Sequence, residues 1–81
     1  MTDKKQIITI IGLGYVGAPL LAAFAEHFEC FGYDLSADRI EELSAGRDST
    51  GELDETELTR VAGLLLTTDP AELARADTWI V

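Results

Sequence analysis

Apolar and polar residues alternate in blocks along this chain, and the spacing inside each block predicts its secondary structure. The block Ile7–Ile11 is β-branched and almost continuously apolar, which is typical of a central parallel strand covered on both faces. From about Tyr15 the period becomes helical, and Pro19 fits the first turn, where N–H groups have no intrahelical acceptor. The spacing predicts a helix whose apolar stripe lies against the sheet, formed by Gly17, Leu21, Phe24 and Phe28.

Capping signals organise the middle of the chain. The apolar and aromatic segment Glu29–Asp34 ends on an acid and predicts a second strand. Ser36 is a candidate N-cap for a helix that Gly46 stops. Asp54, with Glu57 three positions later, is a capping-box variant that predicts another helix. The inward positions of these two helices are Ile40, Leu43, Leu58, Val61 and Ala62.

Three further segments complete the pattern. Leu64–Thr67 is a candidate third strand, although four apolar residues alone do not separate a strand from a buried helix. Asp69, Pro70 and Glu72 occupy the cap, first and third positions of a helix of about two turns. Thr78–Val81 then predicts a fourth strand. Because strand and helix alternate throughout, we expect a parallel sheet with right-handed crossovers.

A glycine pattern follows the first strand directly. In Gly12-Leu13-Gly14-Tyr15-Val16-Gly17, the first glycine allows a sharp turn, the second lets a ligand approach the backbone, and the third lets the helix pack closely. A strand, such a turn and a helix N-terminus form a seat for a dinucleotide pyrophosphate. The alternative is a purely structural turn. The pattern and its context predict an α/β fold, a Rossmann-type sheet of four parallel strands in order 3-2-1-4 with flanking helices.

Two charged residues, one at the end of the predicted second strand and one in the helix after it, are candidates for the adenosine end of the dinucleotide. Asp34 lies 22 residues after Gly12, where a carboxylate accepts hydrogen bonds from ribose hydroxyls and repels a 2′-phosphate, so NAD is favoured over NADP. The alternative for Asp34 is a cap of the next helix. Arg39 could reach the adenosine or the pyrophosphate, and a cation near the ribose would also allow some binding of NADP. Its alternative is a solvated side chain paired with Glu42 or Asp38.

Other reactive side chains have simpler interpretations. Cys30 lies in a predicted buried strand without a basic neighbour, so we interpret it as a packed thiol and not as a nucleophile. His27 stands alone, without a catalytic constellation around it. Eight acids between Asp38 and Glu57 lack the spacing of a calcium loop and are interpreted as a solvated surface. We therefore predict no catalytic residue and no metal ligand here, and we expect Trp79 in the core or an interface.

The composition of the chain disfavours several classes of binding partner. Fifteen acids against six bases give a net charge of −9, which disfavours nucleic acid and anionic membranes as partners. No apolar run approaches the roughly 20 residues that span a bilayer. A single cysteine excludes an internal disulfide and points to a reducing cytoplasm. With 81 residues we expect one small domain, 1–81, that begins with a short lead-in over residues 1–6.

The chain resembles the N-terminal NAD domain of the UDP-glucose/GDP-mannose dehydrogenases in four motifs that occur in order, GLGYVGAPL, GYDLSADRIEEL, GRDSTGELDETEL and LLLTTDPAELARADTWIV. Within the third motif, GRDSTGEL resembles the branch of this family that acts on UDP-N-acetylhexosamines for bacterial surface polysaccharides. The resemblance implies oxidation of the sugar C6 alcohol to a uronic acid with two NAD⁺ reduced. Glu52 matches a recurring family acid to which we assign no role. The resemblance also implies that the pyrophosphate binds at Gly12, Gly14, Tyr15, Val16 and Gly17, and that the adenosine binds at Asp34 and Arg39.

The resemblance also implies what lies beyond this chain. The family continues the fourth strand into a Val-Pro-Thr-Pro segment, and its nucleophilic cysteine, catalytic lysine and aspartate and UDP-sugar domain follow later. We therefore expect an N-terminal fragment, truncated after the fourth strand and inactive alone, that self-associates through the strand edge Trp79–Val81. The alternatives are a non-catalytic NAD-binding or regulatory module, and a Rossmann dehydrogenase of the 6-phosphogluconate or 3-hydroxyacyl-CoA type.

Overall fold

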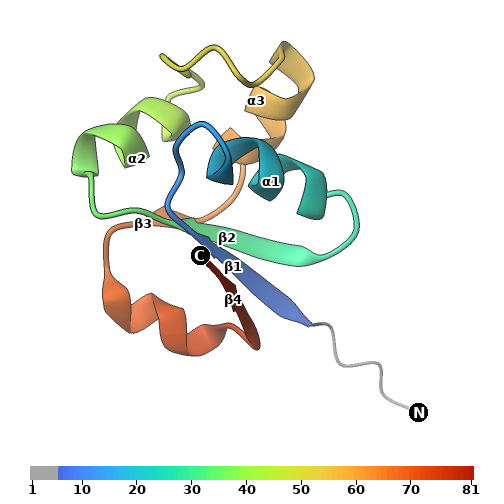
Figure 1. The fold of residues 1–81 in the computed structure, drawn as a ribbon, viewed down its shortest axis with the longest axis vertical. Coiled ribbons are helices and arrows are strands. Elements are labelled where there is room, and N and C mark those ends of the chain that lie inside the picture. The colour runs from blue at the N-terminus through green and yellow to red at the C-terminus, as the bar shows by residue number, and fades with distance from the viewer. Residues whose placement is uncertain (1–5) are drawn as a thin grey trace.

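Four parallel strands in the order β3-β2-β1-β4 form the centre of the structure, as the sequence predicted (Figure 1). The structure is a computed structural model that describes residues 6–81, so the expected lead-in lies outside the described residues except for Gln6. Its elements in chain order are β1 (Ile7–Ile11), α1 (Gly17–Phe24), β2 (Glu29–Tyr33), α2 (Ala37–Ser44), α3 (Glu55–Ala62), β3 (Leu66–Thr67), a 3-10 helix η1 (Pro70–Arg75) and β4 (Thr78–Ile80).

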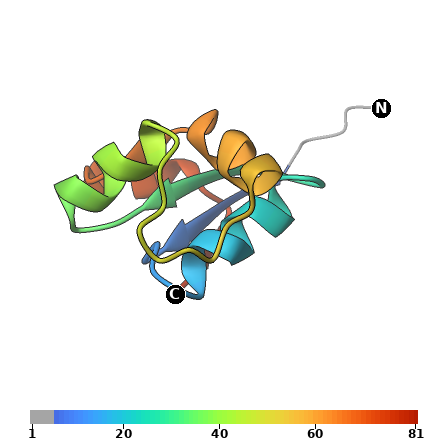
Figure 2. The ribbon, with the colours of Figure 1, turned by 90° about the horizontal axis from the view of Figure 1, so that it is seen from above.

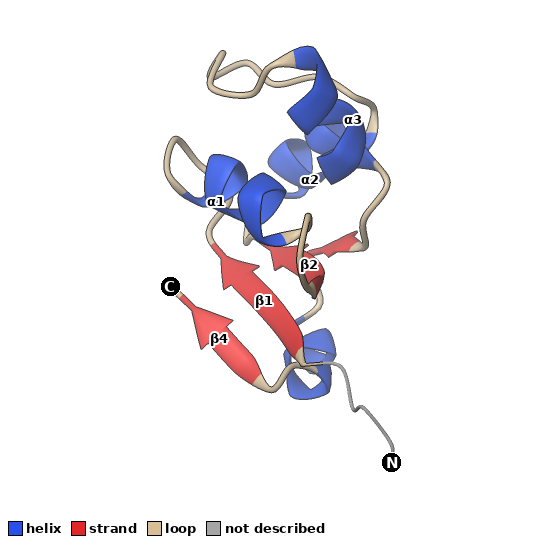
Figure 3. Cartoon of the chain, turned by 90° about the vertical axis from the view of Figure 1, so that its right-hand side faces the viewer, coloured by secondary structure: helices blue, strands red, loops and turns tan. Residues whose placement is uncertain are grey.

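The larger core lies between the sheet and the three α-helices. Figure 3 shows α1, α2 and α3 on one face of the sheet and η1 on the other. Alternate residues of β1 point to the helical face, where Ile8 and Ile10 are buried. The close approach of the layers depends on Gly32 in β2, because a Cβ there would lie 2.9–3.0 Å from three leucine side chains. These leucines, from the glycine turn, α1 and β3, are Leu13, Leu21 and Leu66.

A second, smaller core lies beneath η1. Thr9 of β1 is in register with Phe31 of β2 and Trp79 of β4, so the three side chains share one face of the sheet. Thr9 and Phe31 are buried, whereas Trp79 is half exposed and donates a hydrogen bond from Nε1 to the Leu73 carbonyl in η1 at 2.8 Å. Trp79 therefore joins β4 to η1 and remains accessible at the sheet edge.

The predicted caps form as expected. The Ser36 side chain accepts a hydrogen bond from the Arg39 N–H at 3.1 Å, and α2 is followed by Gly46 with a φ of +80°. Asp54 and Glu57 each accept a hydrogen bond from the other's backbone N–H, at 2.8 and 2.9 Å. These local signals located the helices correctly because each cap is satisfied within three residues in sequence.

Strands β2 and β4 each end one residue earlier than predicted, and α1, β3 and η1 differ more from the sequence prediction. Helix α1 ends at Phe24, because the N–H groups of Glu26 and His27 bond three residues back and tighten the chain into a turn. Phe28, predicted to extend the apolar stripe, lies outside the helix and is 43% exposed. Strand β3 contains only two residues, and the segment after Asp69 is a 3-10 helix of six residues.

Candidate functional site

The chain turns sharply between β1 and α1 at Gly12. Its φ of +96° lies in the left-handed region that favours glycine, and its N–H donates to the Tyr33 carbonyl at the end of β2 over 2.8 Å. The turn is thereby fixed to the carboxyl ends of both central strands. The first glycine thus has the conformation that the sequence predicted for it.

Four successive backbone N–H groups line the turn after Leu13. Within residues 6–81, the N–H groups of Gly14, Tyr15, Val16 and Gly17 have no hydrogen-bond acceptor. They lie at the N-terminus of α1, whose first turn carries no acidic side chain. Free N–H groups and a positive helix end together form a site for an anion. A Cβ at Gly14 would meet nothing within 4 Å, so the space beside these groups is open.

Gly17 has a stricter requirement than Gly14. A Cβ at Gly17 would lie 1.7 Å from the Gly12 carbonyl oxygen and 3.5 Å from the Ile10 side chain. The close approach that the sequence predicted is therefore made mainly with the turn, and only secondarily with the strand. A side chain at this position is sterically excluded, because the backbone of Gly12 and the start of α1 would have to move apart, at a large cost in stability.

Asp34 follows β2 and holds two segments of backbone. Its Oδ2 accepts a hydrogen bond from the Leu13 N–H at 2.7 Å, and its Oδ1 accepts one from the Ser36 N–H at 2.8 Å. A carboxylate has about four acceptor positions, so two remain for further donors. Asp34 therefore links the glycine turn to the start of α2, and it retains the capacity to bind hydroxyl groups. Both interpretations considered for this residue, ribose acceptor and local cap, are compatible with this geometry.

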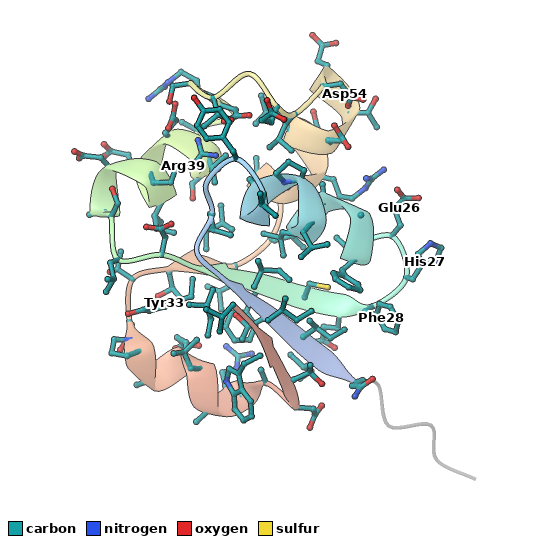
Figure 4. All side chains as sticks on the ribbon, in the orientation of Figure 1. Glu26, His27, Phe28, Tyr33, Arg39 and Asp54 are labelled. Carbon is teal, nitrogen blue, oxygen red and sulfur yellow. The ribbon has the colours of Figure 1, made fainter. Side chains whose placement is uncertain are left out.

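Arg39 extends from α2 to the other side of the same turn residue (Figure 4). Its Nε donates to the Leu13 carbonyl, and its Nη1 donates to Glu42 at 3.1 Å and to Asp48 at 2.8 Å. The side chain is only 11% exposed, and Nη2 is buried without a partner in the described part of the chain. The alternative for Arg39 is thus confirmed in its pairing with Glu42 and wrong in two respects, because the side chain is enclosed and not solvated, and its second partner is Asp48 and not Asp38.

Asp48 is a polar centre that sequence reasoning missed. Its carboxylate accepts hydrogen bonds from Arg39, from the N–H and hydroxyl of Thr50, and from the N–H groups of Glu52 and Leu53. Burial opposes ionisation of the 2% exposed side chain, but the hydrogen bonds from Thr50, Arg39 and Leu53 lower its pKa to about 2. The available signal was the run Asp48-Ser49-Thr50-Gly51, since Asp commonly bonds backbone two residues onward.

A groove of about 310 Å³ lies beside the glycine turn, at the carboxyl ends of β1 and β4. Figure 2 shows this end of the molecule, with the C-terminus close to the turn. The groove is mostly apolar, which suits the flat rings of a dinucleotide more than a free anion. Its lining residues are Ile10, Ile11, Gly12, Gly14, Val16, Gly17, Leu20, Ile80 and Val81.

The remaining candidate side chains lie away from this groove. His27 and Phe28 line a separate hollow of about 510 Å³ beyond the other end of α1 (Figure 4). Cys30 is buried in β2, and burial, with a smaller effect of Glu29, raises the pKa of its thiol, as expected for a packed side chain. Within residues 6–81, no three His, Cys, Asp or Glu side chains are placed to share a metal ion. No helix of these residues has the length and apolar character needed to cross a bilayer.

Known proteins resemble this chain over nearly its whole length. Residues 6–81 match the NAD binding domain of the UDP-glucose/GDP-mannose dehydrogenase family. The chain is 38% identical over 81 residues to a UDP-N-acetyl-D-glucosamine 6-dehydrogenase of Pseudomonas aeruginosa, covering 100% of this chain and 19% of that protein. It is 36% identical over 74 residues to a protein of the same name from Salmonella typhi, covering 91% of this chain and 17% of that protein.

A solved structure supports the same relationship. The UDP-glucose dehydrogenase from the hyperthermophilic archaeon Pyrobaculum islandicum superposes with a TM-score of 0.77 and 30% sequence identity. The superposition covers 96% of this chain and 20% of that chain. The chain therefore spans about a fifth of the length of the curated relatives it matches.

Proposed function

This chain belongs to the UDP-glucose/GDP-mannose dehydrogenase family through its NAD-binding domain, and we propose that it supplies the cofactor site of an NAD-dependent UDP-sugar 6-dehydrogenase. The observation that carries the proposal is the row of four free N–H groups from Gly14 to Gly17 at the start of α1. These groups would bind the pyrophosphate of NAD, and the open space at Gly14 would admit it.

The other residues of the site have distinct proposed roles. Tyr15 and Val16 are exposed at the tip of the turn and would contact the pyrophosphate through their backbone. Asp34 would accept the hydroxyls of the adenosine ribose with its two remaining acceptor positions. Arg39 would support the adenosine side by holding the Leu13 carbonyl, since its guanidinium is enclosed by Glu42 and Asp48.

The proposed reaction follows from the names of the relatives. Two of them are UDP-N-acetyl-D-glucosamine 6-dehydrogenases, so we propose a UDP-N-acetylhexosamine as the substrate. NAD⁺ bound at this site would supply the hydride acceptor, and conversion of a primary alcohol at C6 to a carboxylate requires the removal of two hydrides. Two NAD⁺ would thus be reduced, with water supplying the second carboxylate oxygen.

Residues 6–81 alone would bind the cofactor without oxidising a sugar. The buried thiol of Cys30 lies inside the sheet, and His27 lies beyond the opposite end of α1 from the glycine turn. Neither side chain can serve as a nucleophile or base at the proposed cofactor site. The single free thiol is also suited to a reducing compartment, and we propose the cytoplasm.

Calorimetric titration of NAD⁺ into the 81-residue chain tests this function. We expect saturable binding, and affinity at least about tenfold weaker for Gly14→Ala, because the added methyl group occupies the pyrophosphate space. Gly14 has no positive φ and no close neighbour, so the variant should unfold at the same temperature as the original chain. No binding of NAD⁺ by the original, folded chain would overturn the proposal.

A further inference from the structure

Opposite charges flank one residue of the glycine turn. The N–H of Leu13 donates to the carboxylate of Asp34, and its carbonyl accepts from the guanidinium of Arg39. The two side chains therefore lie at the two ends of a single amino acid. If Asp34 binds the adenosine ribose, as proposed above, Arg39 is the nearby cation that a 2′-phosphate on that ribose would require.

Two carboxylates already form ion pairs with the guanidinium of Arg39. Glu42 and Asp48 each accept a hydrogen bond from Nη1, and both are largely enclosed, with 20% and 2% of their side chains exposed. The other nitrogen, Nη2, is buried and faces no acceptor within residues 6–81. The guanidinium therefore presents no accessible N–H group to a ligand, and two negative charges against one leave the cluster anionic.

Backbone hydrogen bonds hold the two carboxylates in place. The second oxygen of Glu42 accepts the Ser49 N–H, and hydrogen bonds from Ser49 and then from Arg39 lower the pKa of Glu42. Asp48 is fixed more firmly, since its two oxygens accept from Thr50, Glu52 and Leu53 as well as from Arg39. Arg39 cannot exchange these partners for a phosphate without disrupting residues 48–53.

We propose that Glu42 and Asp48 determine cofactor specificity, by occupying Arg39 and so denying the 2′-phosphate of NADP⁺ its cation. This inference rests on the proposed NAD site and assigns the choice between the two dinucleotides to residues that touch neither. It differs from the role of Asp34, which repels the phosphate directly. Rejection of NADP⁺ then has two separable components, the charge at Asp34 and the neutralisation of Arg39.

The test measures NAD⁺ and NADP⁺ affinity by calorimetry for the 81-residue chain, for Asp48→Asn and for Glu42→Gln. Each variant removes one negative charge and keeps the shape of the side chain. We expect the affinity for NADP⁺ relative to NAD⁺ to rise roughly tenfold for Asp48→Asn and about threefold for Glu42→Gln, as expected when one charge near the surface is removed. The gain should shrink with added salt, because screening weakens the attraction between the phosphate and an Arg39 that is less completely neutralised.

Glu41→Gln is the matched control. Glu41 lies on the same helix and is exposed, and its side chain has no hydrogen bond to Arg39. The same change of net charge at this position should leave the ratio of affinities within about twofold of the original. Thermal unfolding of each variant shows whether it is folded, and Glu42→Gln carries the test if Asp48→Asn does not fold.

Two results would overturn the inference alone. One is an unchanged ratio in folded variants that still bind NAD⁺. The other is an equal loss of affinity for both dinucleotides, which would show that Glu42 and Asp48 only stabilise the turn and the following loop. If the original chain binds no NAD⁺, the proposed function fails and the inference fails with it.

Discussion

The carboxylate of Asp34 accepts a hydrogen bond from the backbone N–H of Leu13, 2.7 Å away, and thereby ties the end of β2 to the glycine turn. The residue proposed to recognise the ribose also holds the turn that would bind the pyrophosphate. A substitution at Asp34 is therefore expected to affect cofactor binding in two ways, through the lost ligand contact and through a loosened turn.

Asp34→Asn separates these effects better than Asp34→Ala does. The asparagine oxygen can still accept from Leu13, which is the more buried of the two donors, while the amide nitrogen faces the Ser36 N–H without an acceptor. We expect a loss of about 1–2 kcal/mol in the free energy of unfolding and reduced discrimination between NAD⁺ and NADP⁺. Urea unfolding and calorimetry measure the two quantities. Unchanged discrimination would contradict the role assigned to the carboxylate.

Gly17→Ala should be severely destabilising. Its Cβ would lie 1.7 Å from the Gly12 carbonyl oxygen, so the turn and α1 must separate. We expect a loss of more than about 3 kcal/mol in the free energy of unfolding, measured by urea denaturation. Gly63→Ala is the control, because a Cβ there would make ordinary contacts at 3.6–3.7 Å. It should change stability by less than about 0.5 kcal/mol, and similar losses for both variants would refute the steric argument.

Asp48 should make stability depend on acid pH. Its pKa is about 2 in the folded chain and 3.8 in the absence of these interactions, so the folded state favours the ionised form. The resulting stabilisation of about 2 kcal/mol is complete above roughly pH 4 and is lost as the pH falls towards 2. Urea unfolding between pH 5 and pH 2 should show this loss. Asp48→Asn should be less stable at pH 5 and should have a shallower dependence on pH, and equal slopes would argue against the assignment.

Thr9→Val should stabilise the chain. The Thr9 hydroxyl is fully buried in β1 and has no hydrogen-bond partner within the described residues, so its replacement by a methyl group of similar size removes an unsatisfied polar atom. We expect a gain of about 1 kcal/mol in the free energy of unfolding. Thr67→Val is the contrasting variant, because the Thr67 hydroxyl accepts from the Asp69 N–H at 2.9 Å, and it should lose stability. A loss for Thr9→Val would indicate that its hydroxyl is satisfied.

Self-association through β4 remains a prediction. Within residues 6–81 this strand pairs only with β1, so its outer edge is open, and Val81 beyond it is almost fully exposed. We expect sedimentation velocity to show dimers as the concentration rises, because an uncharged strand edge recruits another strand. Val81→Lys places a charge at this edge and should shift the equilibrium towards monomer. Monomer alone at millimolar concentration would contradict the expectation.

The sequence was most informative where the determinants are local. The N-caps at Ser36 and Asp54 and the glycine turn depend on residues close together in the chain, and each was predicted correctly. The order of the strands was also predicted correctly, although it pairs distant segments such as β1 and β4, because alternating strands and helices after a glycine turn are typical of one topology. The end of α1 was not, because an apolar stripe continues through Phe28 although the backbone has already turned. Periodicity describes which residues could share a face, and it does not show where backbone hydrogen bonding changes.

The interactions around Arg39 required the structure. Leu13 lies 26 residues before Arg39 and Asp48 lies nine after it, and neither spacing is a signal for contact. Sequence reasoning placed Arg39 correctly in the first turn of α2 and named Glu42 correctly as a partner, but it considered only neighbours on the same helix. Asp48 appeared as one acid among eight, because its burial arises only when Arg39 and the backbone of residues 50–53 close around its carboxylate.

The enclosure of Leu13 has a consequence for the thermodynamics of binding. Its side chain is fully buried and both of its backbone polar groups are hydrogen-bonded, so the turn loses its conformational freedom when the chain folds. A dinucleotide that binds there meets a preorganised surface and does not bear that entropic cost a second time. Cofactor affinity and the stability of the fold therefore depend on the same hydrogen bonds, and sequence changes that loosen the turn should lower both.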